Sequence, residues 1–148
     1  MGLQQRIDED YVAAMKAGEA ERRNTLRLLR AALKNAGIEA RGPLSEEAVT
    51  RVLAQQAKMR RDSIEQYDAG GRADLADAER AELAVIESYL PRQLAPDEIE
   101  AEARRVIAAA GARGPGDVGQ VMRQLMADLA GRADGKVASD IVRRLLTG

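Results

Sequence analysis

Basic side chains at helical spacing give the clearest chemical signal near the C-terminal end of the sequence. The residues concerned are Arg123, Arg132, Lys136, Arg143 and Arg144. Arg132 and Lys136 flank the expected start of a helix, where backbone N–H groups also attract anions. These residue types in that position favour phosphate groups, and we predict a phosphate-binding surface here. The alternative is an ordinary charged helix face in contact with solvent.

A second basic stripe lies on a predicted helix nearer the N-terminus. It consists of Arg23, Arg27, Arg30 and Lys34, which recur along one edge of the helix beside a face rich in leucine. A positive stripe of this kind complements an acidic surface on a partner. A solvated helix face is again the alternative.

One charged residue interrupts the apolar face of the helix predicted over 46–69. Arg60 lies on that face together with Gln56, and Glu79 and Glu82 lie within the apolar face of the following helix. A hairpin of the two helices brings these side chains level, and a buried charge without a partner is costly. We therefore predict that Arg60 pairs with Glu82 or Glu79. The pair is either a partly buried structural ion pair or part of a functional polar pocket.

Residue types that are absent exclude several kinds of chemistry. The chain has no Cys and no His, which excludes thiolate nucleophiles, disulfides, imidazole acid–base catalysis and zinc sites built from these ligands. It has three Tyr and no Phe or Trp, so we do not expect an aromatic platform for stacked bases. The glycine-rich run at 114–119 follows a predicted helix, where a dinucleotide site requires a strand. We therefore predict no metal site and no cofactor, and we assign no catalytic residue.

Glycine and proline residues divide the chain into segments that are typical of helices. Good helix formers dominate the composition, and no segment alternates apolar and polar residues over the length of a strand. We therefore predict an all-α protein of seven helices and no strand. The expected helices cover 3–17, 20–36 with a further turn to 41, 46–69, 74–89, 96–110, 115–131 and 134–147.

Two prolines separate the fourth predicted helix from the fifth. Pro91 ends the preceding helix, because the residue before a proline disfavours helical geometry, and Pro96 suits the first position of the next helix. We predict a four-helix N-terminal bundle over 1–90, a linker over 91–96 and a three-helix tail domain over 97–148.

Charge and hydropathy suit a soluble protein. The 148 residues include 23 Lys and Arg and 24 Asp and Glu, for a net charge of −1, so we expect nonspecific binding of nucleic acid to be weak. No apolar run approaches the length of a membrane span, and the first residues lack the apolar core of a secretory signal. We expect a cytoplasmic protein with no membrane partner, and a monomer by default.

Five short motifs spread over most of the chain carry a family resemblance. They are RRDSIEQY at 60–67, GGR at 70–72 with DL at 74–75, YLPRQL at 89–94, DVGQVM at 117–122 and GRADGKV at 131–137. Together they resemble the YqeY-like family. That family shares its tail module, the GatB/YqeY-type tail, with the B subunit of the glutamine-dependent amidotransferase that corrects misacylated Glu-tRNA(Gln) and Asp-tRNA(Asn).

The resemblance implies both a fold and an activity. It implies a four-helix N-terminal bundle and a three-helix tail, and in the amidotransferase that tail contacts folded tRNA while the chemistry takes place elsewhere. Family members carry the label of carbon–nitrogen ligase with glutamine as amido-N-donor. This sequence contains neither the kinase-like cradle domain of the B subunit nor the serine amidase of its partner. We therefore do not expect it to catalyse amide transfer alone.

Three functions follow from these observations. The first is an accessory protein that binds the shape of tRNA, or tRNA held by an enzyme, through phosphates and sugar hydroxyls. The second is a protein-interaction module with no RNA role, which uses the basic stripe near the N-terminus. The third is an amide-transfer enzyme, for which the residues around Arg60 are the candidate pocket.

Overall fold

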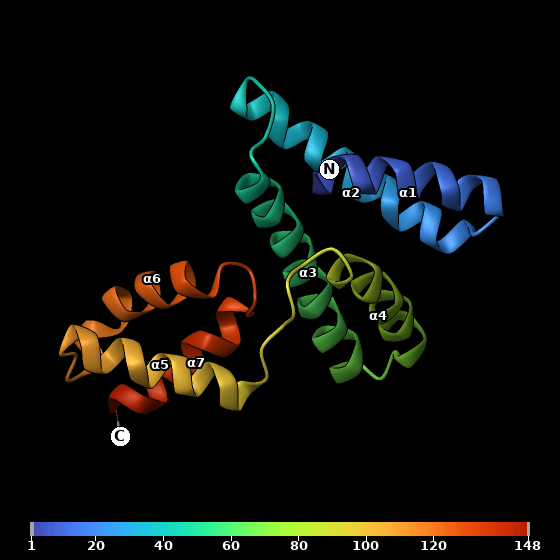
Figure 1. Cartoon of the computed structure of the whole chain (residues 1–148). Coiled ribbons are helices and arrows are strands. Elements are labelled where there is room, and N and C mark those ends of the chain that lie inside the picture. Colours follow the sequence, from blue (N-terminus) through green and yellow to red (C-terminus); the bar gives the residue numbers. More distant parts are fainter. Residues whose placement is uncertain (1, 148) are drawn as a thin grey trace. The chain divides into compact units, whose positions relative to one another are not determined.

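The computed structural model describes residues 2–147, and these residues form an all-helical protein (Figure 1). They contain seven α-helices, one short 3₁₀ helix and no strand. The prediction of an all-α chain with seven helices is therefore confirmed for this part of the protein. The chain divides after Leu90 into two compact units.

The first unit contains two helical hairpins. Its helices are α1 (Leu3–Ala17), α2 (Ala20–Ala40), α3 (Glu46–Ala69) and α4 (Ala73–Glu87). Helix α1 packs along α2, and α3 packs along α4 (Figure 1). Apolar residues at helical spacing meet in one core, which includes Ile7, Leu26, Leu29, Leu33, Leu53 and Ile86. Burying one apolar face of each helix provides most of the stability of such a unit.

The end of α4 is tied to α1 and α2 through a buried tyrosine. The hydroxyl of Tyr89 donates a hydrogen bond to Asp10 at 2.5 Å and accepts one from Arg22 at 3.4 Å. The guanidinium of Arg6 lies 5.4 Å from the ring centroid. Burial raises the pKa of the Tyr89 hydroxyl above its ordinary value, and the hydrogen bond to Asp10 acts in the same direction. Tyr89 therefore remains a hydrogen-bond donor at neutral pH.

The second unit is built from three helices and a short turn. They are α5 (Pro96–Ala110), the 3₁₀ helix (Pro115–Asp117), α6 (Val118–Leu129) and α7 (Gly135–Thr147). Each of the three α-helices contacts the other two. Their shared core includes Ile99, Ala103, Val106, Val121, Leu125, Leu129, Ile141 and Val142.

Helix α2 continues through Gly37 to Ala40, in agreement with the further turn predicted for it, and it ends where Arg41 adopts a left-handed conformation with φ of 59°. Other helix ends differ from the prediction. The segment that Pro115 opens is first a 3₁₀ turn, so α6 begins only at Val118. Helix α4 ends at Glu87, two residues earlier than predicted. Helix ends of this kind are set by local capping that composition does not specify.

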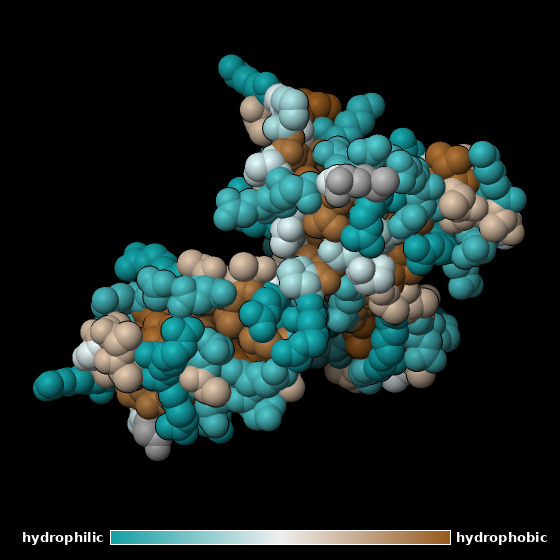
Figure 2. Space-filling view, in the orientation of Figure 1, coloured by the Kyte–Doolittle hydropathy of each residue, from teal (hydrophilic) through white to brown (hydrophobic). Residues whose placement is uncertain are grey.

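The surface of each unit is mainly hydrophilic on the face drawn in Figure 2, with smaller hydrophobic areas between the hydrophilic side chains. Among residues 2–147, no helix is both long and apolar enough to cross a membrane.

Replacement of the capping residue of α3 tests this account of the helix ends. The Ser45 hydroxyl accepts a hydrogen bond from the Ala48 backbone N–H at 3.1 Å. We expect Ser45→Ala to lower the free energy of unfolding by about 1 kcal/mol, because one helix N–H then loses its partner. Ser45→Asp keeps an acceptor and should unfold within a few tenths of a kcal/mol of the unaltered protein. Equal urea midpoints for Ser45→Ala and Ser45→Asp would contradict the capping role.

Candidate functional site

A compact polar cluster lies between α3 and α4. Arg60 is only 8% exposed. Its Nε donates a hydrogen bond to Glu82 Oε2 at 3.2 Å, and its Nη1 donates one to Gln56 Oε1 at 2.8 Å. The Glu79 carboxylate lies 4.0 Å from the same Nε. The hairpin thus gives the one guanidinium two carboxylates and an amide oxygen.

The carboxylates of this cluster are not equivalent. Burial raises the pKa of Glu79 above its ordinary value, and the nearby Glu82 carboxylate adds to the rise, whereas Arg60 opposes it. Glu82 makes the shorter contact with Arg60. The cluster satisfies a buried cation with its own groups, which favours a structural use over a polar pocket that receives substrate.

The five predicted phosphate-binding residues of the second unit do not have equal surroundings. Arg144 forms an ion pair with Glu100 on α5. The backbone N–H of Lys136 donates to Asp134 Oδ1 at 3.1 Å, which caps the start of α7. Arg123 and Arg143 are exposed, and neither has an ion pair with any of the described residues.

Helical spacing separates these cations into different faces. Lys136 and Arg143 are seven residues apart on α7, about two turns, and therefore share one edge of the helix. Arg144 faces α5 through its contact with Glu100, and Arg123 is on α6. The structure brings together only part of the predicted set.

The fifth residue, Arg132, belongs to the loop that connects α6 with α7. This loop contacts the segment that precedes α5. The Leu94 N–H donates to the Arg132 carbonyl at 2.8 Å, and Gln93 Nε2 donates to the Gly131 carbonyl at 2.9 Å. Two of the motifs noted in the sequence, at 89–94 and 131–137, therefore meet through hydrogen bonds.

An arginine that the sequence analysis did not select lies beside this loop. Arg92 makes a bidentate pair with Glu98, at 3.2 and 2.9 Å. This pair, the Ala95 N–H and the positive charge of Arg132 lower the pKa of Glu98 to about 2. Two guanidinium groups thus act on one carboxylate, which leaves positive charge in excess. The position of Arg92 inside the YLPRQL motif was the available signal for it.

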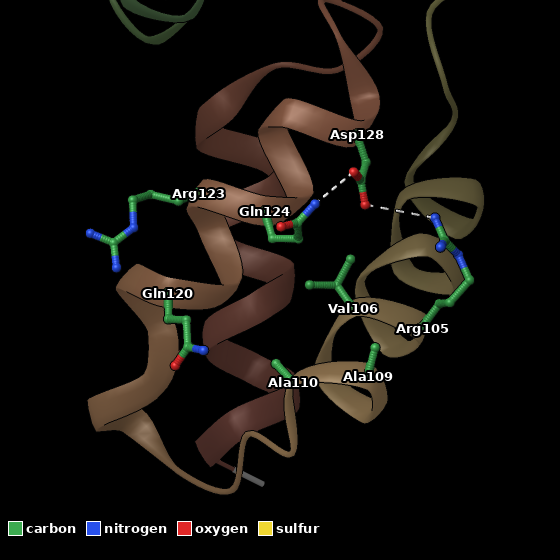
Figure 3. A pocket seen from close by; sticks show the side chains of 8 residues that line it. All are labelled: Arg105, Val106, Ala109, Ala110, Gln120, Arg123, Gln124 and Asp128. Carbon is green, nitrogen blue, oxygen red and sulfur yellow. Dashed lines mark hydrogen bonds and ion pairs between the residues drawn. The ribbon is translucent and has the colours of Figure 1, made fainter.

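A groove of about 590 Å³ runs between α5 and α6 (Figure 3). Val106, Ala109 and Ala110 line it from α5. At one end the Gln124 amide donates to Asp128 at 2.8 Å, and Arg105 lies 3.9 Å from the same carboxylate. In Figure 3 the side chain of Arg123 extends away from these groups. No pattern in the sequence indicates this groove, because it depends on how two helices pack.

The basic stripe of α2 is partly neutralised within the first unit. Arg30 donates to Asp8 at 2.8 Å, and its guanidinium lies 4.5 Å from the centroid of the Tyr11 ring. Arg27 and Lys34 are exposed and have no ion pair with any described residue. Half of the stripe therefore remains available to an acidic partner.

No group of three or more acidic side chains lies close enough to hold a metal ion within the described part of the chain. The acidic residues that the structure does bring near one another, such as Glu79 and Glu82, already contact Arg60.

Comparison with known proteins identifies a family and several relatives that match parts of the sequence. A family model described as Yqey-like protein matches residues 4–146. Altered inheritance of mitochondria protein 41 from Lachancea thermotolerans is 32% identical over 99 residues, which are 66% of this chain and 53% of that protein. The protein of the same name from Pyrenophora tritici-repentis is 29% identical over 129 residues, 86% of this chain and 71% of that protein. The protein of the same name from Eremothecium gossypii is 32% identical over 85 residues, which are 57% of this chain and 46% of that protein.

These relatives overturn one expectation. Each is named as a mitochondrial protein, so the expectation of a cytoplasmic location is wrong. That expectation was a default based on the lack of apolar targeting signals, and such a lack does not distinguish one aqueous compartment from another. Because the match spans about half of the first relative, the activity of the whole relative does not transfer directly.

Replacing each carboxylate beside Arg60 by an amide should have different effects on stability. We expect Glu82→Gln to lower the free energy of unfolding by about 1–2 kcal/mol, because Arg60 loses its nearest counter-charge. Glu79→Gln should leave stability at pH 7 unchanged or higher, because the raised pKa of Glu79 means that the fold favours its neutral form. Urea unfolding of both variants provides the measurement. Equal losses from both would contradict this assignment.

The pair between Arg92 and Glu98 predicts a pH dependence. Because the folded-state pKa of Glu98 is lowered, its carboxylate stabilises the fold fully above its ordinary pKa of 4.5. This contribution is lost as the pH falls from there to about 2. We expect Glu98→Gln to have a lower urea midpoint than the unaltered protein at pH 7, and the difference to narrow toward pH 2. A difference that does not vary with pH would show that the charge has no effect.

Proposed function

The chain belongs to the YqeY-like family, and from that premise we propose that it is an accessory protein that recognises the shape of tRNA, free or held by an enzyme. In this proposal residues 1–90 are a four-helix bundle, 91–96 a linker and 97–148 the tail that contacts RNA. The observation that carries the proposal is the exposure of the Arg123 and Arg143 side chains. Both guanidinium groups are exposed and have no ion pair with a described residue, so neither must break an internal contact to bind a phosphate.

Recognition of this kind relies on backbone phosphates and sugar hydroxyls. The chain has few aromatic residues, and Tyr89 is buried in the first unit, so stacking on exposed bases is not the basis of the proposal. Arginine forms bidentate contacts with phosphate that fix orientation without reading sequence. Such contacts suit a protein that recognises a fold shared by many tRNAs.

The relation to the amidotransferase is one of recognition and not of catalysis. Family resemblance brings the label of carbon–nitrogen ligase with glutamine as amido-N-donor. The cluster of Gln56, Arg60, Glu79 and Glu82 was the candidate pocket for that chemistry. Its groups bond to one another, which supports an accessory role.

A second candidate function rests on a different observation. The large hydrophobic side chains that are exposed in the described residues all belong to the first unit: Val12, Met15, Leu28, Ile38 and Met59. Together with Arg27 and Lys34, they suit the docking of an acidic protein partner. In that case the second unit has no RNA role.

A titration of tRNA at two salt concentrations tests the first proposal. We expect saturable binding by the full chain that weakens as salt rises. Arg123→Ala combined with Arg143→Ala should weaken binding about tenfold and reduce the slope of log K against log salt by about 2, because about one counterion is released per phosphate contact.

Arg27→Ala combined with Lys34→Ala is the matched control, because it removes the same charge from the first unit. We expect it to leave both affinity and slope unchanged. The proposal fails if the full chain does not bind tRNA at low salt, or if both double variants lower the affinity equally.

A further inference from the structure

The α6–α7 loop (residues 130–134) is held by side-chain and backbone donors from the segment that precedes α5 (residues 91–95). Gln93 Nε2 donates to the Gly131 carbonyl at 2.9 Å and to the Pro91 carbonyl at 3.0 Å. The Leu94 N–H donates to the Arg132 carbonyl at 2.8 Å. One glutamine amide therefore joins its own segment to the loop.

The loop backbone needs this support. Ala130 and Gly131 are both left-handed, with φ of 46° and 82°. Such a conformation is unfavourable for a residue with a Cβ and persists where neighbouring groups fix it. The carbonyls of Gly131 and Arg132 follow the end of α6, where helix geometry supplies no donor. The two donors from residues 93 and 94 satisfy these carbonyls.

The same loop carries Arg132. Its charge acts on the Glu98 carboxylate, which also pairs with Arg92. A shift of the loop therefore changes the position of the Arg132 guanidinium relative to that of Arg92. Asp134 of this loop caps the start of α7, because its carboxylate accepts a hydrogen bond from the backbone N–H of Lys136. The backbone conformation of the loop therefore bears on the position of Arg132.

We propose that Gln93 is a positioning residue that holds the loop from which Arg132 reaches a phosphate of RNA. The inference rests on the proposed function, since Arg132 is another of the cations predicted to bind phosphate in the second unit. Gln93 contributes no charge and does not contact the phosphate. It acts by fixing the Gly131 carbonyl, and through it the loop.

Gln93→Met tests this role, because methionine has a similar length and no N–H donor. We expect the Leu94 amide to exchange its hydrogen about tenfold faster, because the loop opens more often. The affinity for tRNA should fall about three- to tenfold, the range expected for the loss of one or two hydrogen bonds that preorganise a site. The slope of affinity against salt should stay unchanged, because no charge is removed.

Two comparisons make the result specific. Gln120→Met alters an exposed glutamine of α6 and should change neither exchange nor affinity. Arg132→Ala should weaken binding and also reduce the salt slope by about 1, which a positioning residue does not do.

The outcomes also separate this inference from the proposed function. If the unaltered chain does not bind tRNA, the proposed function fails and the role of Gln93 fails with it. If the unaltered chain binds and Gln93→Met binds equally well, only the positioning role is overturned. Unchanged exchange at Leu94 in Gln93→Met would likewise overturn it.

Discussion

A guanidinium group stays charged at every pH that the protein meets, so each arginine must be paired or solvated. This constraint organises both units. In the first unit Arg60 is buried, and Gln56, Glu79 and Glu82 surround it, so the charge is used within the fold. In the second unit Arg144 is paired with Glu100, whereas Arg123 and Arg143 are left to solvent. Only the second kind of arginine is free to bind an external anion without a structural cost.

The same distinction makes a net charge of −1 compatible with the phosphate-binding surface that we propose. Acidic residues are used inside the units as helix caps and as partners of specific arginines. Asp134 caps α7, Asp117 accepts the Arg113 N–H, and Glu98 pairs with Arg92. Net charge therefore predicts little about local recognition, because screening limits each charge to near neighbours. In the proposed function, the positions of a few exposed arginines decide where a phosphate binds.

The sequence predicted the number and class of the helices, because glycine, proline and capping residues such as Ser45 act locally. It also placed Arg60 level with Glu82, because register in a helical hairpin follows from the turn at Gly70 and Gly71. The bonds between residues 93–94 and 131–132 were beyond prediction, because they join backbone groups that are distant along the chain. The groove between α5 and α6 was missed for the same reason. Which arginines are paired and which are exposed could not be predicted either, because this depends on how the helices pack in each unit.

NMR signals of the arginine Nε–H groups, recorded during addition of tRNA, test the central claim most directly. The account predicts that the signals of Arg123 and Arg143 shift as phosphates bind, while the signal of Arg60 stays in place because its donors remain bonded to Glu82 and Gln56. Shifts confined to arginines of the first unit, such as Arg27, would contradict the account. So would a spectrum that does not change at saturating tRNA.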